Sequence, residues 1–132
     1  MAFEFVTTIP VRYRDLDPFD HVNNAVYVTY LEQARVEYLQ AVLDLHLSDV
    51  NIVMAGLELD YRSPVTFDES VAVAVRTTDL GRSSIRMAYE VRADGNVAAT
   101  AETTIVYVGD GDRSTPLPDA WREAIESYEP AL

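Results

Sequence analysis

The chain has 132 residues, of which 48% are hydrophobic, so it is long enough for a single domain over residues 1–132 but not for two. Its net charge of −12, from 22 acidic residues against 10 arginines and no lysine, repels nucleic acid and anionic membranes and excludes both as general partners. Because it has no cysteine, no run of ~18 apolar residues and no signal-peptide pattern, we expect a cytoplasmic protein without disulfides or a transmembrane helix.

The acidic composition also bears on the substrate and on the cell. An anionic ligand would be repelled by such a surface, so a site for one would need local arginines. A salt-rich cytosol favours lysine-free acidity, because ions screen the self-repulsion, but the codon bias of a GC-rich genome gives the same composition. The sequence does not separate these two explanations.

Alternating side chains predict a first strand over 3–13, which Pro10 places at a sheet edge or a bulge. A proline-broken turn follows and gathers carboxylate, imidazole and amide groups: Asp15, Asp17, Asp20, His21, Asn23 and Asn24. Apolar residues then recur at the spacing of one helical face: Tyr27, Tyr30, Leu31, Ala34, Tyr38, Val42 and Leu45. Since this periodicity starts near Val26, we expect a long helix beginning at Asn23 or Asn24.

Four more strands are predicted after this helix, over 57–62, 71–77, 85–92 and 97–108, with a short helix around Trp121 at the end. Short hairpin links make these four strands antiparallel, and the single long helix must pack on one face of their sheet. The residues alone therefore predict an α+β fold. A chain of this size then has apolar edge and surface left over, which dimerisation would bury.

The polar turn and the helix carry a resemblance. Arg14-Asp15-Leu16-Asp17, His21-Val22-Asn23-Asn24-Ala25-x-Tyr27 and Tyr30-Leu31-Glu32-x-Ala34-Arg35 resemble the signature of hotdog-fold acyl-CoA thioesterases of the 4-hydroxybenzoyl-CoA thioesterase-like family. The resemblance implies a five-stranded antiparallel sheet wrapped around one central helix. It also implies a homodimer joined edge to edge, often doubled to a homotetramer, with active sites at the subunit boundary. The activity implied is hydrolysis of acyl-CoA to acid and CoA, without a cofactor.

Asp17 matches the family's catalytic carboxylate, which attacks the thioester carbonyl or activates water; the sequence does not separate nucleophile from general base. An aspartate before proline also suits a helix N-cap, but the helix is expected to begin later. The resemblance implies that the amide near Asn24, at the positive end of the helix dipole, holds the thioester oxygen as it gains charge. His21 could orient Asp17, contact substrate or support the turn. Asp20 departs from the glycine of many relatives, and aspartate tolerates a positive φ better than most residues.

The candidates for substrate binding are Asn23, Tyr27, Arg82 and Ser83. Asn23 could fix the turn through its own backbone or touch the substrate. Tyr27 could line an aromatic or an aliphatic pocket, together with Tyr30, Tyr61 and Met54. The segment with Arg82 and Ser83, between the third and fourth strands, resembles the family's nucleotide-contacting turn, and arginine suits CoA phosphates. Arg62 and Arg86 are weaker candidates of the same kind.

Other interpretations stay open. The chain could be a non-catalytic acyl-CoA-binding module, or a hydratase that pairs Asp17 with His21. It could also be an acyl-carrier-protein thioesterase, although its acidic surface argues against an acidic carrier. No metal site is expected, because the two histidines, His21 and His46, are too few for zinc and the Asp15 region lacks the glycine and glutamate of an EF-hand. The absence of a G-x-S-x-G motif argues against a serine hydrolase.

Overall fold

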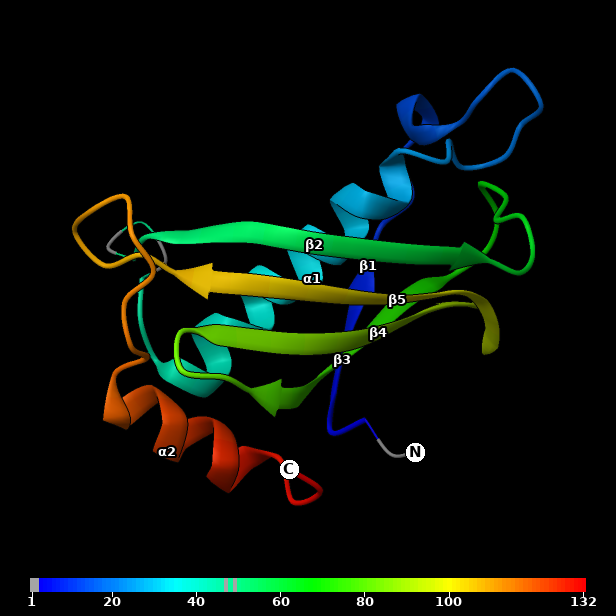
Figure 1. Ribbon diagram of the computed structural model, residues 1–132. Helices are drawn as coiled ribbons and strands as arrows, with labels where there is room; N and C mark the ends of the chain where they lie inside the picture. The colour runs from blue at the N-terminus through cyan, green and yellow to red at the C-terminus, as the bar shows by residue number, and fades with distance from the viewer. Residues whose placement is uncertain (1–2, 47, 49) are drawn as a thin grey trace.

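The computed structural model describes residues 3–46, 48 and 50–132, and it consists of a five-stranded sheet with one long helix against it (Figure 1). The elements are β1 (Phe5–Ile9), a 3-10 turn η1 (Tyr13–Asp15), α1 (Val26–Leu43), β2 (Ile52–Tyr61), β3 (Val71–Leu80), β4 (Ser84–Ala93), β5 (Asn96–Tyr107) and α2 (Asp119–Tyr128). The strands lie in the order β1-β3-β4-β5-β2, and each neighbouring pair is antiparallel. The predicted α+β architecture, with one helix on an antiparallel sheet, is confirmed.

The place of β2 differs from the prediction that hairpins link the last four strands. β2 pairs with β5 rather than with β3, so that Tyr61 lies opposite Ala99. The connection over 62–70 is longer than a hairpin loop and carries the chain across the end of the sheet. The β4–β5 hairpin is present as predicted, and Asp94 and Gly95 have the φ values of 50° and 85° that its tight turn requires.

Two strand boundaries also differ from the predicted ones. β1 ends at Ile9, because Pro10 has no N–H to continue the ladder and the chain then turns into η1. β2 begins at Ile52, before the predicted start at 57. Its first residues do not show the clean alternation of a half-buried strand, because most of β2 is exposed.

The long helix is shorter at both ends than its pattern indicated. The Asn23 side chain accepts a hydrogen bond from the Ala25 amide (2.8 Å), which holds residues 23–25 in a turn, and α1 begins at Val26. The helix ends where Asp44 adopts a left-handed conformation with φ 52°. The polar cluster therefore lies before the helix, rather than within its first turn.

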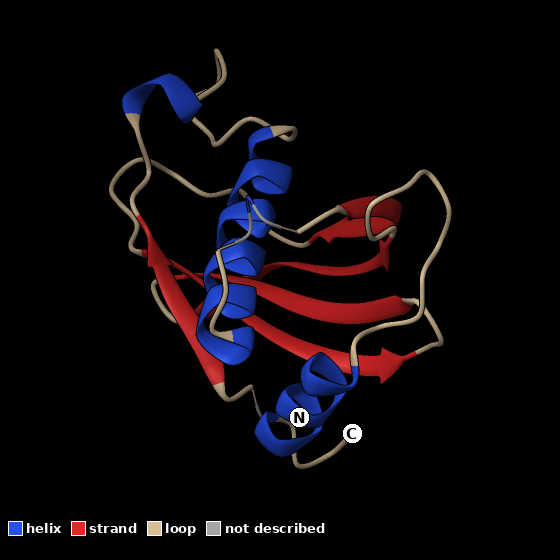
Figure 2. Ribbon diagram, turned by 90° about the vertical axis from the view of Figure 1, so that its left-hand side faces the viewer, coloured by secondary structure: helices blue, strands red, loops and turns tan. Residues whose placement is uncertain are grey.

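The core lies between α1 and the sheet. One face of α1 is buried there: Tyr27, Tyr30, Leu31, Ala34, Tyr38, Leu39 and Leu43. Alternate residues of β4 and β5 point toward the helix and are buried, as the period of a strand requires. Figure 2 shows α1 crossing one face of the sheet, with α2 packed at one end.

The helix side of β2 stays open, because α1 packs mainly on β1 and β3. Met54, Leu57 and Tyr61 stand opposite buried residues of β5, yet they are 44%, 41% and 48% exposed. β2 is also an edge strand, so one side of its backbone has no ladder partner in the described chain. Open apolar side chains beside open backbone groups make β2 a surface suited to pairing.

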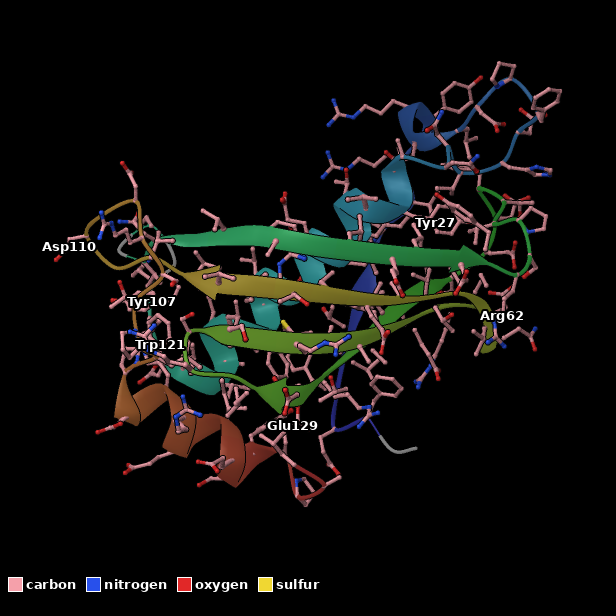
Figure 3. The ribbon with its side chains drawn as sticks, in the orientation of Figure 1. Tyr27, Arg62, Tyr107, Asp110, Trp121 and Glu129 are labelled. Atoms are coloured by element: carbon pink, nitrogen blue, oxygen red, sulfur yellow. The ribbon has the colours of Figure 1, made fainter. Side chains whose placement is uncertain are left out.

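The chain after α2 ties this helix to the core through a buried carboxylate. Glu129 accepts hydrogen bonds from the Tyr38 hydroxyl (2.6 Å) and from the Thr77 amide (2.8 Å). Within α2 itself, Trp121 packs against Tyr107 with ring centroids 4.8 Å apart (Figure 3). None of the helices in the described part of the chain has the length and hydropathy needed to cross a bilayer.

Candidate active site

Asp15 anchors the polar turn to the start of α1. Its Oδ2 accepts a hydrogen bond from the Tyr30 hydroxyl (2.7 Å) and another from the Arg12 amide (2.9 Å), while its carbonyl accepts one from the Asn23 amide (2.8 Å). Burial, reinforced by the Asp15 carboxylate, raises the pKa of Tyr30 well above its ordinary value, so the phenol stays a donor. The turn is thus fixed to the helix on either side of Asp17.

Asp17 stabilises its own turn and does not cap α1. Its Oδ1 accepts hydrogen bonds from the amides of Phe19 (2.8 Å) and His21 (3.2 Å), and its own amide donates to the His21 carbonyl (2.7 Å). Oδ2 has no hydrogen-bond donor among the residues that the structure describes, which leaves one carboxylate oxygen open for chemistry. Asp20 has φ 64°, so this position requires the positive φ that aspartate tolerates.

One amide at the start of α1 is also open. The amide of Asn23 donates to Asp15, that of Ala25 to the Asn23 side chain, and that of Val26 to the Asn23 carbonyl. The Asn24 amide, between them, meets no acceptor within the described residues. An open N–H at the positive end of a helix is a ready donor for an oxygen that gains negative charge.

A cleft of about 250 Å³ brings several of these groups together. It is lined by Asp17, His21, Val22, Asn24 and Tyr27 from the turn and α1, and by Tyr61, Arg62, Ser63 and Pro64 from the end of β2. Figure 3 shows Tyr27 and Arg62 at this end of the sheet. The two sides of the cleft, one from the turn and α1 and the other from the end of β2, are joined by backbone contacts. The Val22 amide donates to the Val65 carbonyl (2.8 Å), and His21 pairs with Thr66.

The wall from β2 was largely missed by sequence reasoning. Tyr61 was expected only as a pocket residue and Arg62 only as a weak candidate, while Ser63 and Pro64 were assigned no part in a site. No spacing rule links these residues to Asp17, because the contact spans two elements and a crossover. A strand end closed by Ser-Pro is the one local signal that this segment turns away from the sheet.

Three predicted substrate-binding residues do not line this cleft. Asn23 uses its side chain on the Ala25 amide. Arg82 and Ser83 lie in the β3–β4 hairpin, at the opposite end of the sheet, where the Arg82 carbonyl accepts from the Leu117 amide (2.9 Å). Within one protomer, therefore, the hairpin does not share a cleft with Asp17.

The five-stranded antiparallel sheet with one long helix against it is the fold that the resemblance to hotdog-fold thioesterases implies, and the cleft at the start of α1 holds an open carboxylate oxygen and an open amide. Residues 11–125 match the model of the Thioesterase-like superfamily, and the chain belongs to that family. This result confirms the family prediction and makes the chain a thioesterase by enzyme class.

Two similar proteins are thioesterases by name, and a third is uncharacterized. A thioesterase from Thermus thermophilus, solved with coenzyme A and Zn, is 43% identical with a TM-score of 0.89, and the match covers 97% of this chain and 96% of that one. The long-chain acyl-CoA thioesterase FadM of Escherichia coli is 29% identical over 107 residues, which are 77% of this chain and 81% of FadM. The uncharacterized protein YsmA of Bacillus subtilis is 28% identical over 89 residues, and the match spans 67% of this chain but 60% of YsmA.

The zinc in the Thermus structure raises the question of a metal site in this chain. The described residues contain no group of three or more His, Asp or Glu side chains placed to hold a metal ion. His21 stands in the cleft with Asp17 alone as a carboxylate neighbour in its lining.

Proposed function

We propose that this protein hydrolyses acyl-CoA to the free acid and CoA, with Asp17 as the catalytic carboxylate and the Asn24 amide as oxyanion donor. The observation that carries the proposal is that both groups have an open hydrogen-bonding position and line the same cleft. CoA as the leaving group is supported by the Thermus relative solved with coenzyme A and by FadM, an acyl-CoA thioesterase.

The reaction follows from this geometry. The open Oδ2 of Asp17 attacks the thioester carbonyl carbon, or takes a proton from a water molecule that attacks it. The carbonyl oxygen gains negative charge as the tetrahedral intermediate forms, and the Asn24 amide and the positive end of α1 stabilise that charge. The C–S bond then breaks and the CoA thiolate leaves. With Asp17 as nucleophile, water hydrolyses the resulting anhydride.

His21 and Tyr27 complete the cleft. The His21 backbone binds Asp17 on both sides, through its amide and its carbonyl, so the histidine position fixes the carboxylate. Its ring makes no hydrogen bond inside the described chain and is free to contact the substrate. Burial raises the pKa of Tyr27 above its ordinary value of 10.

The binding of the CoA arm follows from a homodimer paired along β2. A two-fold axis through an antiparallel β2–β2 pair sets the Tyr61 end of one strand beside the Ile52 end of the other. The β3–β4 hairpin lies at that Ile52 end, so the partner's Arg82 and the partner's Ser83 come to the same end of the dimer as Asp17.

The distance between the cleft and the partner's β3–β4 hairpin suits the length of CoA. From β2 of one protomer, the partner's β4 is three strand spacings away, through the partner's β2 and β5, and the partner's β3 is four, which is about 14 to 19 Å at ~4.8 Å for each spacing. The reacting sulfur and the nucleotide phosphates stand at opposite ends of the long CoA molecule, so two distant sites are needed. The partner's Arg82 supplies the positive charge that a phosphate requires in a protein of net charge −12.

The test is thiol release from aromatic, short-chain and long-chain acyl-CoAs, at low and at molar KCl, with Asp17→Asn beside wild type. The asparagine keeps an oxygen for the Phe19 and His21 amides, so the turn is retained, and we expect a loss of ~10²–10⁴ in rate. Asp20→Asn is the matched control, because asparagine also tolerates its positive φ and Asp20 does not line the cleft. Binding of acyl-CoA without turnover in wild type would replace the enzyme with a binding module.

A further inference from the structure

The carbonyl of Asn24 has an unusual partner for a group at a helix start. Asn24 precedes the N-cap residue Ala25, so its carbonyl lies outside the helical ladder, and the Val28 amide donates to the Ala25 carbonyl (3.2 Å). The Asn24 carbonyl accepts the hydroxyl of Tyr61 at 2.7 Å, across a separation of 37 residues. A side chain of β2 thus supplies the hydrogen bond that the helix does not.

The Tyr61 ring is itself held in place. It stands edge-on to the Tyr27 ring, with centroids 5.0 Å apart and planes at 84°, while its backbone is paired with Ala99 of β5. The amides of Arg62 and Ser63 both donate to the Ala98 carbonyl, at 2.8 and 3.1 Å, so β2 remains anchored just beyond Tyr61. The hydroxyl therefore reaches Asn24 from a strand end that is hydrogen-bonded to β5.

We infer that Tyr61 is a positioning residue: its hydroxyl fixes residue 24 so that the open Asn24 amide points into the cleft. The inference rests on the proposed function, because it assigns the orientation of the amide that is proposed to bind the oxyanion. The peptide that carries the Asn24 amide is held through the Asn23 carbonyl, which accepts the Val26 amide (2.9 Å), and the Tyr61 hydroxyl holds the next peptide, between Asn24 and Ala25. Without the Tyr61 bond, the Asn24 carbonyl has no donor within the described residues, and the peptide after Asn24 is held only by the bond from the Ala25 amide to the Asn23 side chain.

Loss of the Tyr61 hydroxyl should weaken stabilisation of the transition state rather than binding of the substrate. A donor that is preorganised toward the oxyanion acts only as charge develops, so its loss lowers kcat and leaves KM nearly unchanged. Removing one whole oxyanion donor costs about 10²–10³ in rate, and loosening it costs less. For Tyr61→Phe we expect a fall of roughly 10- to 100-fold in kcat, with KM within about twofold.

The experiment compares Tyr61→Phe with Tyr13→Phe. Tyr13 is 80% exposed, lies outside the cleft and makes no hydrogen bond through its hydroxyl in the described chain, so its variant should keep the wild-type kcat. The phenylalanine at 61 keeps the ring contact with Tyr27, and the thermal midpoint of both variants is measured to show that the fold is retained. Incorporation of 4-aminophenylalanine at position 61 returns a donor and should restore most of kcat.

A second readout follows the amide directly. An acyl-CoA analogue with a methylene group in place of the thioester sulfur presents a ketone that cannot be hydrolysed, and a hydrogen bond from Asn24 lowers its C=O stretching frequency. We expect this shift in wild type and in Tyr13→Phe, and a smaller shift in Tyr61→Phe. Equal kcat and equal C=O frequency in Tyr61→Phe and wild type would overturn the inference. Absence of hydrolysis and of any shift in wild type would instead overturn the proposed function.

Discussion

The buried carboxylate of Glu129 allows a stability prediction to be worked from the structure. Glu129 is 6% exposed and accepts two hydrogen bonds, from the Tyr38 hydroxyl and from the Thr77 amide. In Glu129→Ala the Thr77 amide loses its acceptor, which costs about 1–3 kcal/mol for a buried donor. Tyr38 retains the Thr77 hydroxyl at 2.8 Å and loses only the advantage of a charged acceptor, about 1 kcal/mol.

The expected total is about 2–4 kcal/mol in the free energy of unfolding, measured by urea titration. Unfolding entropy of ~2.1 cal/mol/K per residue over 132 residues converts about 3 kcal/mol into a fall of roughly 11 °C in Tm. Glu126→Ala, on the exposed side of α2, should change stability by less than about 0.5 kcal/mol. A double-mutant cycle with Tyr38→Phe should give a coupling of about 1 kcal/mol. If Glu129→Ala matched the Glu126 control, α2 would not be held by this carboxylate.

Three further predictions concern pH, assembly and the CoA arm. Burial and neighbouring carboxylates raise the pKa values of Tyr30 and Tyr38 above their ordinary value of 10. Their contribution to stability is therefore complete below pH 10 and falls at higher pH, where unfolded tyrosines ionise first; urea titrations from pH 8 to 11 should show this fall, and Tyr38→Phe should reduce it. Leu57→Glu places like charges across the proposed β2 pair and should give a monomer with little activity, as light scattering and thiol release would reveal. Arg82→Gln should raise KM several-fold for acyl-CoA but leave acyl-pantetheine, which lacks the nucleotide phosphates, unchanged.

Local patterns predicted the parts of the fold that local physics determines. The helical spacing from Tyr27 to Tyr38 gave α1, since those residues form one buried face. The Asp94-Gly95 dipeptide gave the β4–β5 hairpin, because both residues accept a positive φ. The start of α1 was placed too early because the Asn23 side chain diverts the Ala25 amide into a turn, and a helical period carries no sign of such a bond.

These local patterns do not determine which strands pair with one another. Strand alternation is the same whether β2 pairs with β3 or with β5, so the edge position of β2 followed only from the three-dimensional structure. The same limit applies to the residues of the cleft. Asp17, His21 and Asn24 lie within one local turn and were named together, whereas Tyr61 to Pro64 reach the cleft through that unforeseen β2–β5 pairing.

The proposed site separates reaction chemistry from substrate choice along the chain. The carboxylate and the oxyanion amide belong to one turn, which Asp15 and the Asn23 side chain lock through bonds within residues 12–30. One side of the cleft and the proposed dimer edge belong to β2. The proposed phosphate contact belongs to the β3–β4 hairpin. Since Tyr61 is the side-chain link from β2 to the Asn24 carbonyl, a change elsewhere on β2 can reshape the pocket or the interface without moving the reacting groups, provided that this hydroxyl stays in place.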